Sequence, residues 1–159
     1  MKEGQEDYDT MNARDDFLTQ RINYKNFWAK GNLCLVPMTW FFEPNYEKSH
    51  HERWRIGMAD QSPFAVAGLW REWDEKDGTK SFSFTQITVN ADEHPLMKRF
   101  HRPGKEKRSL VIVPPAEYDD WLSCKDPERA RAFLQLYPPE LMYAEPAPKQ
   151  ETTLQGELF

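Results

Sequence analysis

Three side chains have residue types suited to proton transfer: Asn12, Glu43 and His101. An asparagine amide both donates and accepts hydrogen bonds, so Asn12 can orient an amine and an oxygen together. Glu43 follows three aromatic residues (40–42), and burial beside them would raise its pKa to a value useful for general acid–base catalysis. The pKa of a histidine such as His101 lies near physiological pH. These residues are therefore candidates for one catalytic site.

Each candidate also has an ordinary structural interpretation. Asn12 is also the type of residue that caps a helix or forms a turn. Glu43 precedes a proline at a strand end, where most carboxylates are solvated, and His101 lies in a basic loop that is typical of a surface. Arg14 can grip phosphate through two hydrogen bonds or be a plain surface charge. Spacing alone does not decide between these interpretations.

Positive charge is concentrated between residues 98 and 108, which read KRFHRPGKEKR. Six basic residues against Glu106 give this run a local net charge of +5, although the chain as a whole has a net charge of −5. Because salt limits each charge to about 10 Å, a local patch can bind phosphate even on an acidic protein. Arg102, Lys105, Lys107 and Arg108 are the candidate phosphate ligands. The alternative is a solvated loop.

Short strands in the middle of the chain must position these residues. Alternating and continuous apolar patterns predict strands over residues 33–37, 40–43, 53–58, 64–73, 81–89 and 109–113. Helical patterns cover residues 15–28, 117–123 and 128–137, and a short helix or turn covers residues 94–100. A shift in the apolar phase near Thr85 predicts a bulge. The order of elements predicts an α+β fold with a mainly antiparallel, barrel-like sheet and short peripheral helices.

The chain of 159 residues fits one domain, which we expect over residues 1–145, followed by a flexible tail over 146–159. No apolar run approaches membrane-spanning length and no signal peptide follows Met1, so we expect a cytoplasmic protein without a membrane partner. Cys34 and Cys124 match neither a metal-binding nor a disulfide spacing. The sequence therefore predicts no metal site and no cofactor.

Four segments in a fixed order resemble the SRAP (SOS response-associated peptidase) family. Residues 11–14, MNAR, resemble its NAR motif, and LCLVP (33–37) with WFFE (40–43) resembles its CLVP…GFYEW block. FAVAGLW (64–70) is similar to its FAGLW strand. Its closing portion is matched by residues 83–91, His101, residues 110–114 and Trp121-Leu122. The resemblance runs from Tyr8 to Tyr143.

The resemblance implies DNA repair chemistry in the SOS response. Family members expose an N-terminal cysteine by removing the initiator methionine, the self-processing behind the word peptidase. That cysteine condenses with the aldehyde of an abasic site in single-stranded DNA and closes a thiazolidine, which is a covalent protein–DNA linkage. On this chain the assisting residues fall on Asn12, Glu43 and His101, and the arginine that contacts DNA falls on Arg14. A cytoplasmic protein that associates with the nucleoid when DNA-bound is implied.

Two departures from the family bear on this function. Six residues separate His101 from Arg108, where the family has His-x-Arg, so the phosphate-binding arginine falls on Arg108, with Arg102 as its rival. The family begins with Met-Cys-Gly and several strands ahead of the NAR block, whereas Met1-Lys2-Glu3 stands just ahead of it here. Neither Cys34 nor Cys124 offers a free α-amine. We expect crosslinking to be impaired, and whether this chain is an enzyme stays open.

Three explanations of the second departure stay open. The first is that the start codon is misassigned, the second is that the upstream part is a separate polypeptide, and the third is that the gene is a degraded remnant. The family's N-terminal strands would then be missing from the sheet.

The last five residues, QGELF, resemble the pentapeptide that binds the bacterial sliding clamp. Gln155 would form hydrogen bonds at the edge of the clamp pocket, and Leu158 and Phe159 would enter it. The alternative is a frayed tail without a partner.

Two other functions are compatible with the sequence. Without the nucleophile, the chain would be a non-catalytic module that binds single-stranded DNA and is tethered to the sliding clamp. A metallohydrolase would use His50, His51, His94 and Glu43, but adjacent histidines in a loop seldom face one ion and no H-E-x-x-H motif is present.

Overall fold

A computed structural model describes residues 11–149, which form two β-sheets with short helices beside them. The strands are β1 (Asn12–Arg14), β2 (Leu33–Met38), β3 (Trp40–Asn45), β4 (Glu52–Met58), β5 (Phe64–Asp74), β6 (Lys80–Asn90), β7 (Arg108–Leu110), β8 (Ile112–Val113) and β9 (Met142–Pro146). The α-helices are α1 (Lys25–Ala29), α2 (Tyr118–Ser123) and α3 (Pro127–Arg131). Short 3₁₀ turns are η1 (Asp15–Phe17), η2 (Met97–Arg99), η3 (Pro115–Glu117) and η4 (Pro139–Leu141).

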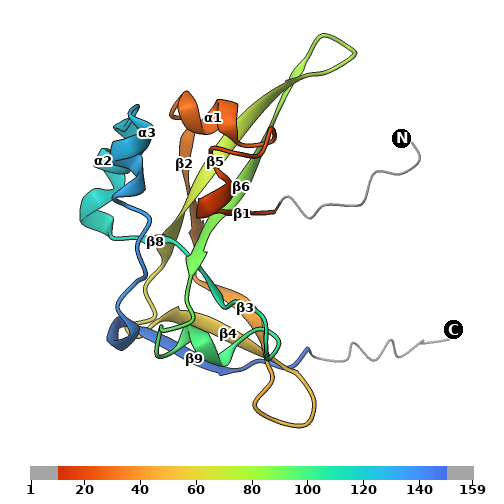
Figure 1. Cartoon of the computed structure of the whole chain (residues 1–159), viewed down its shortest axis with the longest axis vertical. Helices are drawn as coiled ribbons and strands as arrows, with labels where there is room; N and C mark the ends of the chain where they lie inside the picture. Colours follow the sequence, from red (N-terminus) through yellow and green to blue (C-terminus); the bar gives the residue numbers. More distant parts are fainter. Residues whose placement is uncertain (1–10, 150–159) are drawn as a thin grey trace, which may run out of the picture.

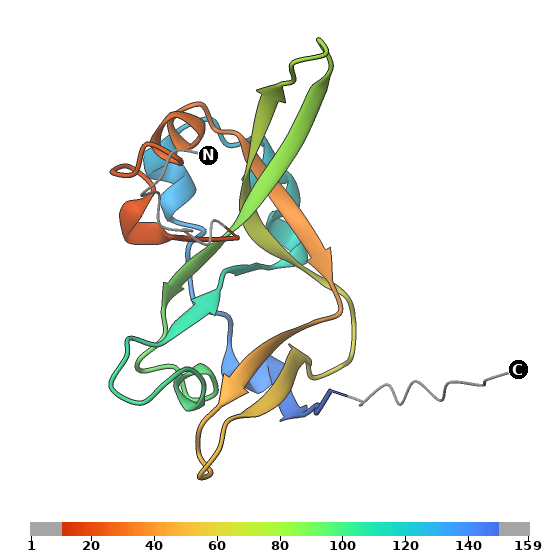
Figure 2. The same ribbon diagram turned by 90° about the vertical axis from the view of Figure 1, so that its right-hand side faces the viewer.

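The larger sheet has six strands and is built around the long hairpin of β5 and β6. Its order is β1-β6-β5-β2, with β7 also paired to β6 and β8 to β5. All pairs are antiparallel except β1 with β6. The hairpin turns at Asp77-Gly78, where Gly78 has a φ of 82° that favours glycine. The hairpin tip projects away from the rest of the chain (Figure 2).

The smaller sheet contains three antiparallel strands in the order β3-β4-β9. It lies below the larger sheet in Figure 1, while the helices lie beside the larger one. Only Thr39 separates β2 from β3, so the chain passes almost directly from one sheet to the other. β9 pairs with β4 as far as Pro146, which lies opposite Trp54.

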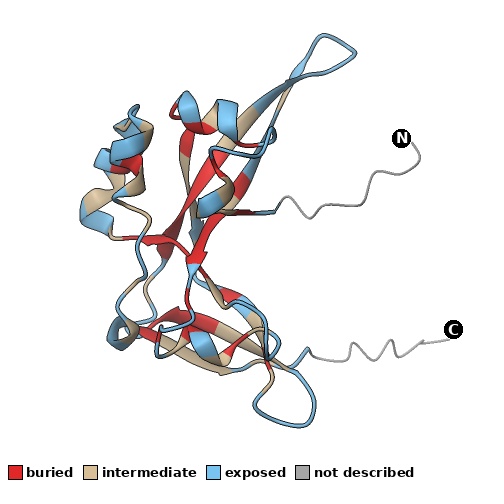
Figure 3. Cartoon of the chain, in the orientation of Figure 1, coloured by how far each residue is buried: buried red, intermediate tan, exposed pale blue. Residues whose placement is uncertain are grey.

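Two apolar clusters hold these layers together, and both are dominated by buried strand residues (Figure 3). The first cluster packs Trp28 and Trp121 of the helices against Leu69 and Ile87 of the larger sheet. The second cluster contains Phe100, which is fully buried among residues of both sheets. Burial of side chains of this size contributes roughly 1.5–3 kcal/mol each. The candidate residues of β3 and of the loop after Phe100 are thereby fixed to a packed core.

The α+β class and the mainly antiparallel pairing are confirmed, and no closed barrel forms among residues 11–149. The helix predicted over residues 15–28 is largely turns, with η1 at its start and the short α1 at its end. The helix predicted over 128–137 stops at Arg131, because Phe133 and Leu134 leave helical geometry to pack against the first cluster. The predicted bulge near Thr85 was wrong. β6 stays in register, and Phe82 and Phe84 simply point to the opposite face from Ile87.

No helix within residues 11–149 is long and apolar enough to cross a membrane.

Candidate active site

The alternation of β3 sends Glu43 inward, to the same side as the buried residues Phe41 and Asn45. The Glu43 side chain keeps only 19% of its surface exposed. This burial raises the pKa of the Glu43 carboxyl from 4.5 to about 7, because the charged form loses its hydration. Glu43 can therefore hold or release a proton near neutral pH, as the sequence predicts for a carboxylate beside three aromatic residues.

His101 is held beside this carboxyl by an unusual backbone. Its φ of 63° is rare for a residue with a side chain, and its backbone N–H donates to the Pro44 carbonyl at 3.1 Å. The preceding residue, Phe100, bridges to Asn45, whose amide also donates to the Arg99 carbonyl at 3.2 Å. Non-local contacts thus fix His101, which is why no local sequence pattern announces this geometry.

The imidazole of His101 lies between Glu43 and the backbone of Arg108. Its Nε2 is 3.1 Å from the Arg108 carbonyl oxygen, so this nitrogen carries a proton that it donates. Its Nδ1 is 3.6 Å from Oε2 of Glu43. Burial lowers the pKa of His101, and Lys107 lowers it further, while the hydrogen bond to Arg108 opposes both. A neutral imidazole beside a carboxyl that titrates near pH 7 is suited to passing a proton between them.

Asn12 reaches the same site from the other sheet. β1 runs parallel to β6, with Asn12 opposite Gln86 and Arg14 opposite Thr88. The Gln86 backbone N–H donates to the Met11 carbonyl at 2.8 Å, which holds the start of β1 in place. β1 has three residues, which is too short for its apolar pattern to predict a strand. Its position depends on β6, about 75 residues further along.

These residues line one cleft of about 550 Å³ between the two sheets. Asn12, Arg14, Glu43, His101 and Arg108 contribute polar groups to it, as do Gln86, Thr88 and Ser109. The apolar side of the cleft is lined by Met38, Trp40, Phe41, Phe42 and Leu110. The structure thus brings together five of the residues that the sequence singles out. Arg102, Lys105 and Lys107 are not among the lining residues. Gln155, Leu158 and Phe159 lie outside the described residues.

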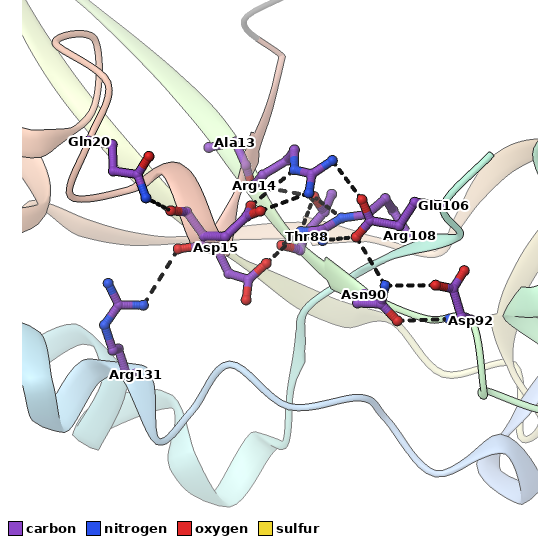
Figure 4. A network of polar contacts seen from close by, with 11 residues as sticks. Ala13, Arg14, Asp15, Gln20, Thr88, Asn90, Asp92, Glu106, Arg108 and Arg131 are labelled. Atoms are coloured by element: carbon purple, nitrogen blue, oxygen red, sulfur yellow. Dashed lines mark hydrogen bonds and ion pairs between the residues drawn. The ribbon is translucent and has the colours of Figure 1, made fainter.

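Arg14 and Arg108 form an ion-pair network along the cleft (Figure 4). Nη1 of Arg14 lies 2.7 Å from Glu106, and its Nη2 lies 2.7 Å from Asp16. Arg108 bonds to Glu106 at 2.8 Å and to Asp15 at 2.5 Å. The hydrogen bond to Asp16 raises the pKa of Arg14, and bonds from Arg108 and Asn90 lower that of Glu106. Both guanidinium groups are therefore held in place by carboxylates.

Asp15, Asp16 and Glu106 are the members of this network that sequence reasoning missed. Glu106 was visible as the one acid in the basic run, but nothing local indicated that it bridges two arginines. The rest of the run is also engaged. Nζ of Lys107 donates to the carbonyl oxygens of His101 and Arg102, each at 3.0 Å. Arg102 and Lys105 are exposed on the loop.

Candidate metal ligands do not assemble in the described part of the chain. No group of three or more His, Cys, Asp or Glu side chains there could hold an ion. His94 is 4% exposed, accepts the backbone N–H groups of Leu96 and Met97 at Nδ1, and places Nε2 2.8 Å from the Tyr137 carbonyl. Both of its nitrogens are thus used in holding the fold.

The family model "SOS response associated peptidase (SRAP)" matches residues 1–150. The chain belongs to the SRAP family. The family prediction made from the four sequence segments is therefore confirmed.

Two similar SRAP relatives carry names that describe their role. "Abasic site processing protein YoqW" of Bacillus subtilis is 27% identical over 140 residues, which cover 86% of this chain and 59% of YoqW. "Abasic site processing protein HMCES" of Xenopus tropicalis is 28% identical over 104 residues, which cover 54% of this chain and 31% of HMCES. The chain thus spans about three fifths of the length of YoqW.

Two crystal structures have a similar fold. A protein from Bordetella bronchiseptica matches with a TM-score of 0.83 and 35% identity, over 87% of this chain and 65% of its own. A protein from Bacteroides thetaiotaomicron matches with a TM-score of 0.73 and 28% identity, over 85% of this chain and 57% of its own. The SRAP-like fold therefore extends across most of the chain.

Proposed function

We propose that the chain binds single-stranded DNA and holds an abasic site in the cleft between its two sheets. The observation that carries this proposal is the Glu43–His101 pair, separated by 3.6 Å, in a cleft also lined by Arg14 and Arg108. Arginines bind phosphate through paired hydrogen bonds, and a poised carboxyl–imidazole pair can move protons on a ring-opened sugar. The names of YoqW and HMCES support the same substrate.

Each cleft residue has a role in this proposal. Asn12 orients the sugar oxygen, because its amide both donates and accepts. Glu43 and His101 exchange a proton with the open-chain aldehyde or with the group that attacks it. Arg14 and Arg108 hold the phosphates on either side of the missing base. Arg102, Lys105 and Lys107 provide a weaker positive field on the neighbouring loop.

The covalent step needs a cysteine with a free α-amine. The amine and the aldehyde form an imine with release of water, and the thiol then adds to the imine carbon to close the ring. Cys34 and Cys124 are the two cysteines of the sequence, and both amines are tied up in peptide bonds. Burial also raises the pKa of the Cys34 thiol to about 11, which disfavours the reactive thiolate. We therefore propose that residues 1–159 supply the binding cleft and that neither of these cysteines is the nucleophile.

The test compares an oligonucleotide that carries one abasic site with its undamaged counterpart. Fluorescence anisotropy should show preferential binding of the abasic strand by the chain, and His101→Ala should reduce that preference. His51→Ala is the matched control, since His51 is an exposed histidine outside the cleft lining. Equal affinity for both oligonucleotides would contradict the proposal. A band that survives boiling in denaturant would contradict the statement that neither Cys34 nor Cys124 is the nucleophile.

Tethering to the sliding clamp is a second, separable part of the proposed function. It rests on the sequence QGELF alone, in which Gln155, Leu158 and Phe159 match a clamp-binding pentapeptide. Removing residues 155–159 should abolish clamp binding and leave the melting temperature and the affinity for abasic DNA unchanged. Unchanged affinity for the clamp after truncation would show that residues 155–159 do not bind it.

A further inference from the structure

The outer face of the smaller sheet presents two aromatic rings at the edge of the cleft. Trp40 and Phe42 are 44% and 41% exposed, although side chains of this size are usually buried. They alternate with Phe41 and Glu43 along β3, so both rings lie on the face opposite the Glu43 side chain. Both nevertheless line the cleft at its rim. The outer face is therefore continuous with the proposed DNA site.

An arginine covers each of these rings. The Cζ atom of Arg53 lies 3.3 Å from the centroid of the Phe42 ring, and that of Arg55 lies 5.3 Å from the Trp40 ring. The register explains these contacts, since Arg55 is opposite Phe42 and Arg53 is opposite Pro44 on the neighbouring strand. Each pair places a guanidinium over an aromatic ring, the arrangement in which a guanidinium can stack and expose its own outer plane.

The charge of this surface suits a polyanion. Arg55 is paired with Glu145 of β9, which cancels one charge. Arg53 makes no ion pair within residues 11–149 and donates only to the Ala147 carbonyl at 3.2 Å. A flat aromatic surface with an uncompensated cation is the combination that binds unstacked bases and their phosphates.

We propose that Trp40 and Phe42, with Arg53 and Arg55, form a stacking subsite for the bases that flank the lesion on the same single strand. This subsite rests on the proposed function and extends it beyond the abasic sugar. Residues two apart on a strand are spaced by about 6.7 Å, twice the 3.4 Å rise of stacked bases. Two neighbouring bases can each meet one ring–arginine pair only when they are unstacked, so the subsite selects single strands over duplex.

The test measures affinity for a labelled abasic single strand with Trp40→Leu and Phe42→Leu, which keep apolar cover but remove the flat ring. Each variant should weaken binding by about five- to 150-fold, the range that loss of one base–aromatic stack produces. Trp73→Leu is the matched control. Trp73 is 43% exposed and lies under Arg71 at 3.5 Å, but on the β5–β6 hairpin outside the cleft lining. The Trp73→Leu variant should bind the abasic strand as tightly as the wild type does.

A second arm separates stacking from folding. Replacing the flanking bases of the oligonucleotide by base-free spacers should weaken binding to the wild type but not to the Trp40→Leu/Phe42→Leu double variant. Arg53→Lys, which retains charge and loses the flat plane, should weaken binding as well. If Trp40→Leu behaves like Trp73→Leu, or if both proteins respond equally to the spacers, the subsite is wrong. A wild type that prefers no abasic strand would overturn the proposed function itself.

Discussion

The Oε2 atom of Glu43 lies 3.6 Å from Nδ1 of His101, on strands and loops that belong to different parts of the chain. The separation exceeds hydrogen-bonding distance, so the two groups share the cleft without a direct bond. Burial raises the pKa of Glu43 to about 7 and lowers that of His101. Near neutral pH the carboxyl is therefore protonated in about half of the molecules, while the imidazole is neutral.

This arrangement predicts a pH-dependent cost in stability at Glu43. The folded chain holds the Glu43 proton more tightly than the unfolded chain does, because the pKa rises from 4.5 to about 7. The free energy of unfolding therefore falls as pH rises through that window, and the cost is complete above about pH 7, at up to about 3 kcal/mol. Glu43→Gln removes the cost, so its advantage over wild type should grow between pH 4.5 and 8 in urea unfolding experiments.

The control for this prediction is Glu140→Gln, an exposed carboxyl on η4. Its stability should stay parallel to that of the wild type across the same pH range. The pKa of His101 is lowered on folding from its ordinary value of 6.5. The free energy of unfolding therefore also falls as pH drops below that value, and it does so equally in wild type and Glu43→Gln. Parallel curves for Glu43→Gln and wild type would show that Glu43 is hydrated like a surface carboxyl.

Much of this site could be predicted from the sequence because its residues follow strand periodicity. Glu43 follows an aromatic run, and alternation along β3 places it inward. The backbone of His101 could not be predicted, because its φ of 63° is held by contacts with Pro44 and Asn45 that are distant in sequence. The parallel pairing of β1 with β6 was hidden for the same reason. The helix predicted over 15–28 failed over residues 18–24, because turns there bury Leu18 and Tyr24 in the first cluster, and this packing outweighs a weak helical pattern.

The ion pairs of Glu106 with two arginines should lower the affinity of the chain for DNA. Its two oxygens bridge Arg14 and Arg108 at 2.7 and 2.8 Å, and Asn90 donates to it at 3.0 Å. A phosphate must compete with this carboxylate for both guanidinium groups. Glu106→Gln should therefore bind single-stranded DNA about fivefold more tightly at low salt, the equivalent of ~1 kcal/mol. Glu140→Gln, measured by the same anisotropy assay, removes one negative charge elsewhere and should have a smaller effect.

The Arg14→Gln background distinguishes direct competition from a general change in charge. If Glu106 acts by occupying Arg14, the gain from Glu106→Gln should shrink when Arg14 is already absent. A gain of equal size in both backgrounds would mean that only the overall field matters.

Arg108 and Arg102 should differ in their effect on stability. Arg108 is 14% exposed and holds Asp15, Glu106 and the Thr88 carbonyl, whereas Arg102 is exposed and makes no ion pair within residues 11–149. Arg108→Gln leaves Asp15 without its arginine and removes one of the two arginines that hold Glu106, so it should cost about 2 kcal/mol in chemical denaturation. Arg102→Gln should stay within about 0.5 kcal/mol of wild type. Similar losses in both variants would refute Arg108 as the anchored arginine of the cleft.

The outer face of the larger sheet predicts self-association. Within the described residues β2 pairs with no strand other than β5, so its other edge is open to a further strand, and Trp121 of α2 donates to the Cys34 carbonyl at 2.9 Å. Beside that edge, Leu35, Val36, Trp70, Phe82 and Phe84 line a shallow apolar hollow of about 240 Å³. Phe82 and Phe84 are 66% and 58% exposed. Apolar surface next to an open edge recruits further strands, so the chain should elute larger than a monomer as its concentration rises.

Phe84→Ser should reverse this association, because it places a hydroxyl at the centre of the hollow while the core behind β6 stays intact. Leu122→Ser is the control, since Leu122 is 43% exposed on α2 and does not line the hollow. Size-exclusion chromatography and thermal melts at two protein concentrations measure the effect. The Phe84→Ser melt should become independent of concentration, while that of Leu122→Ser should not. A wild type that elutes as a monomer with one sharp, concentration-independent melt would mean that the open edge of β2 is tolerated without a partner.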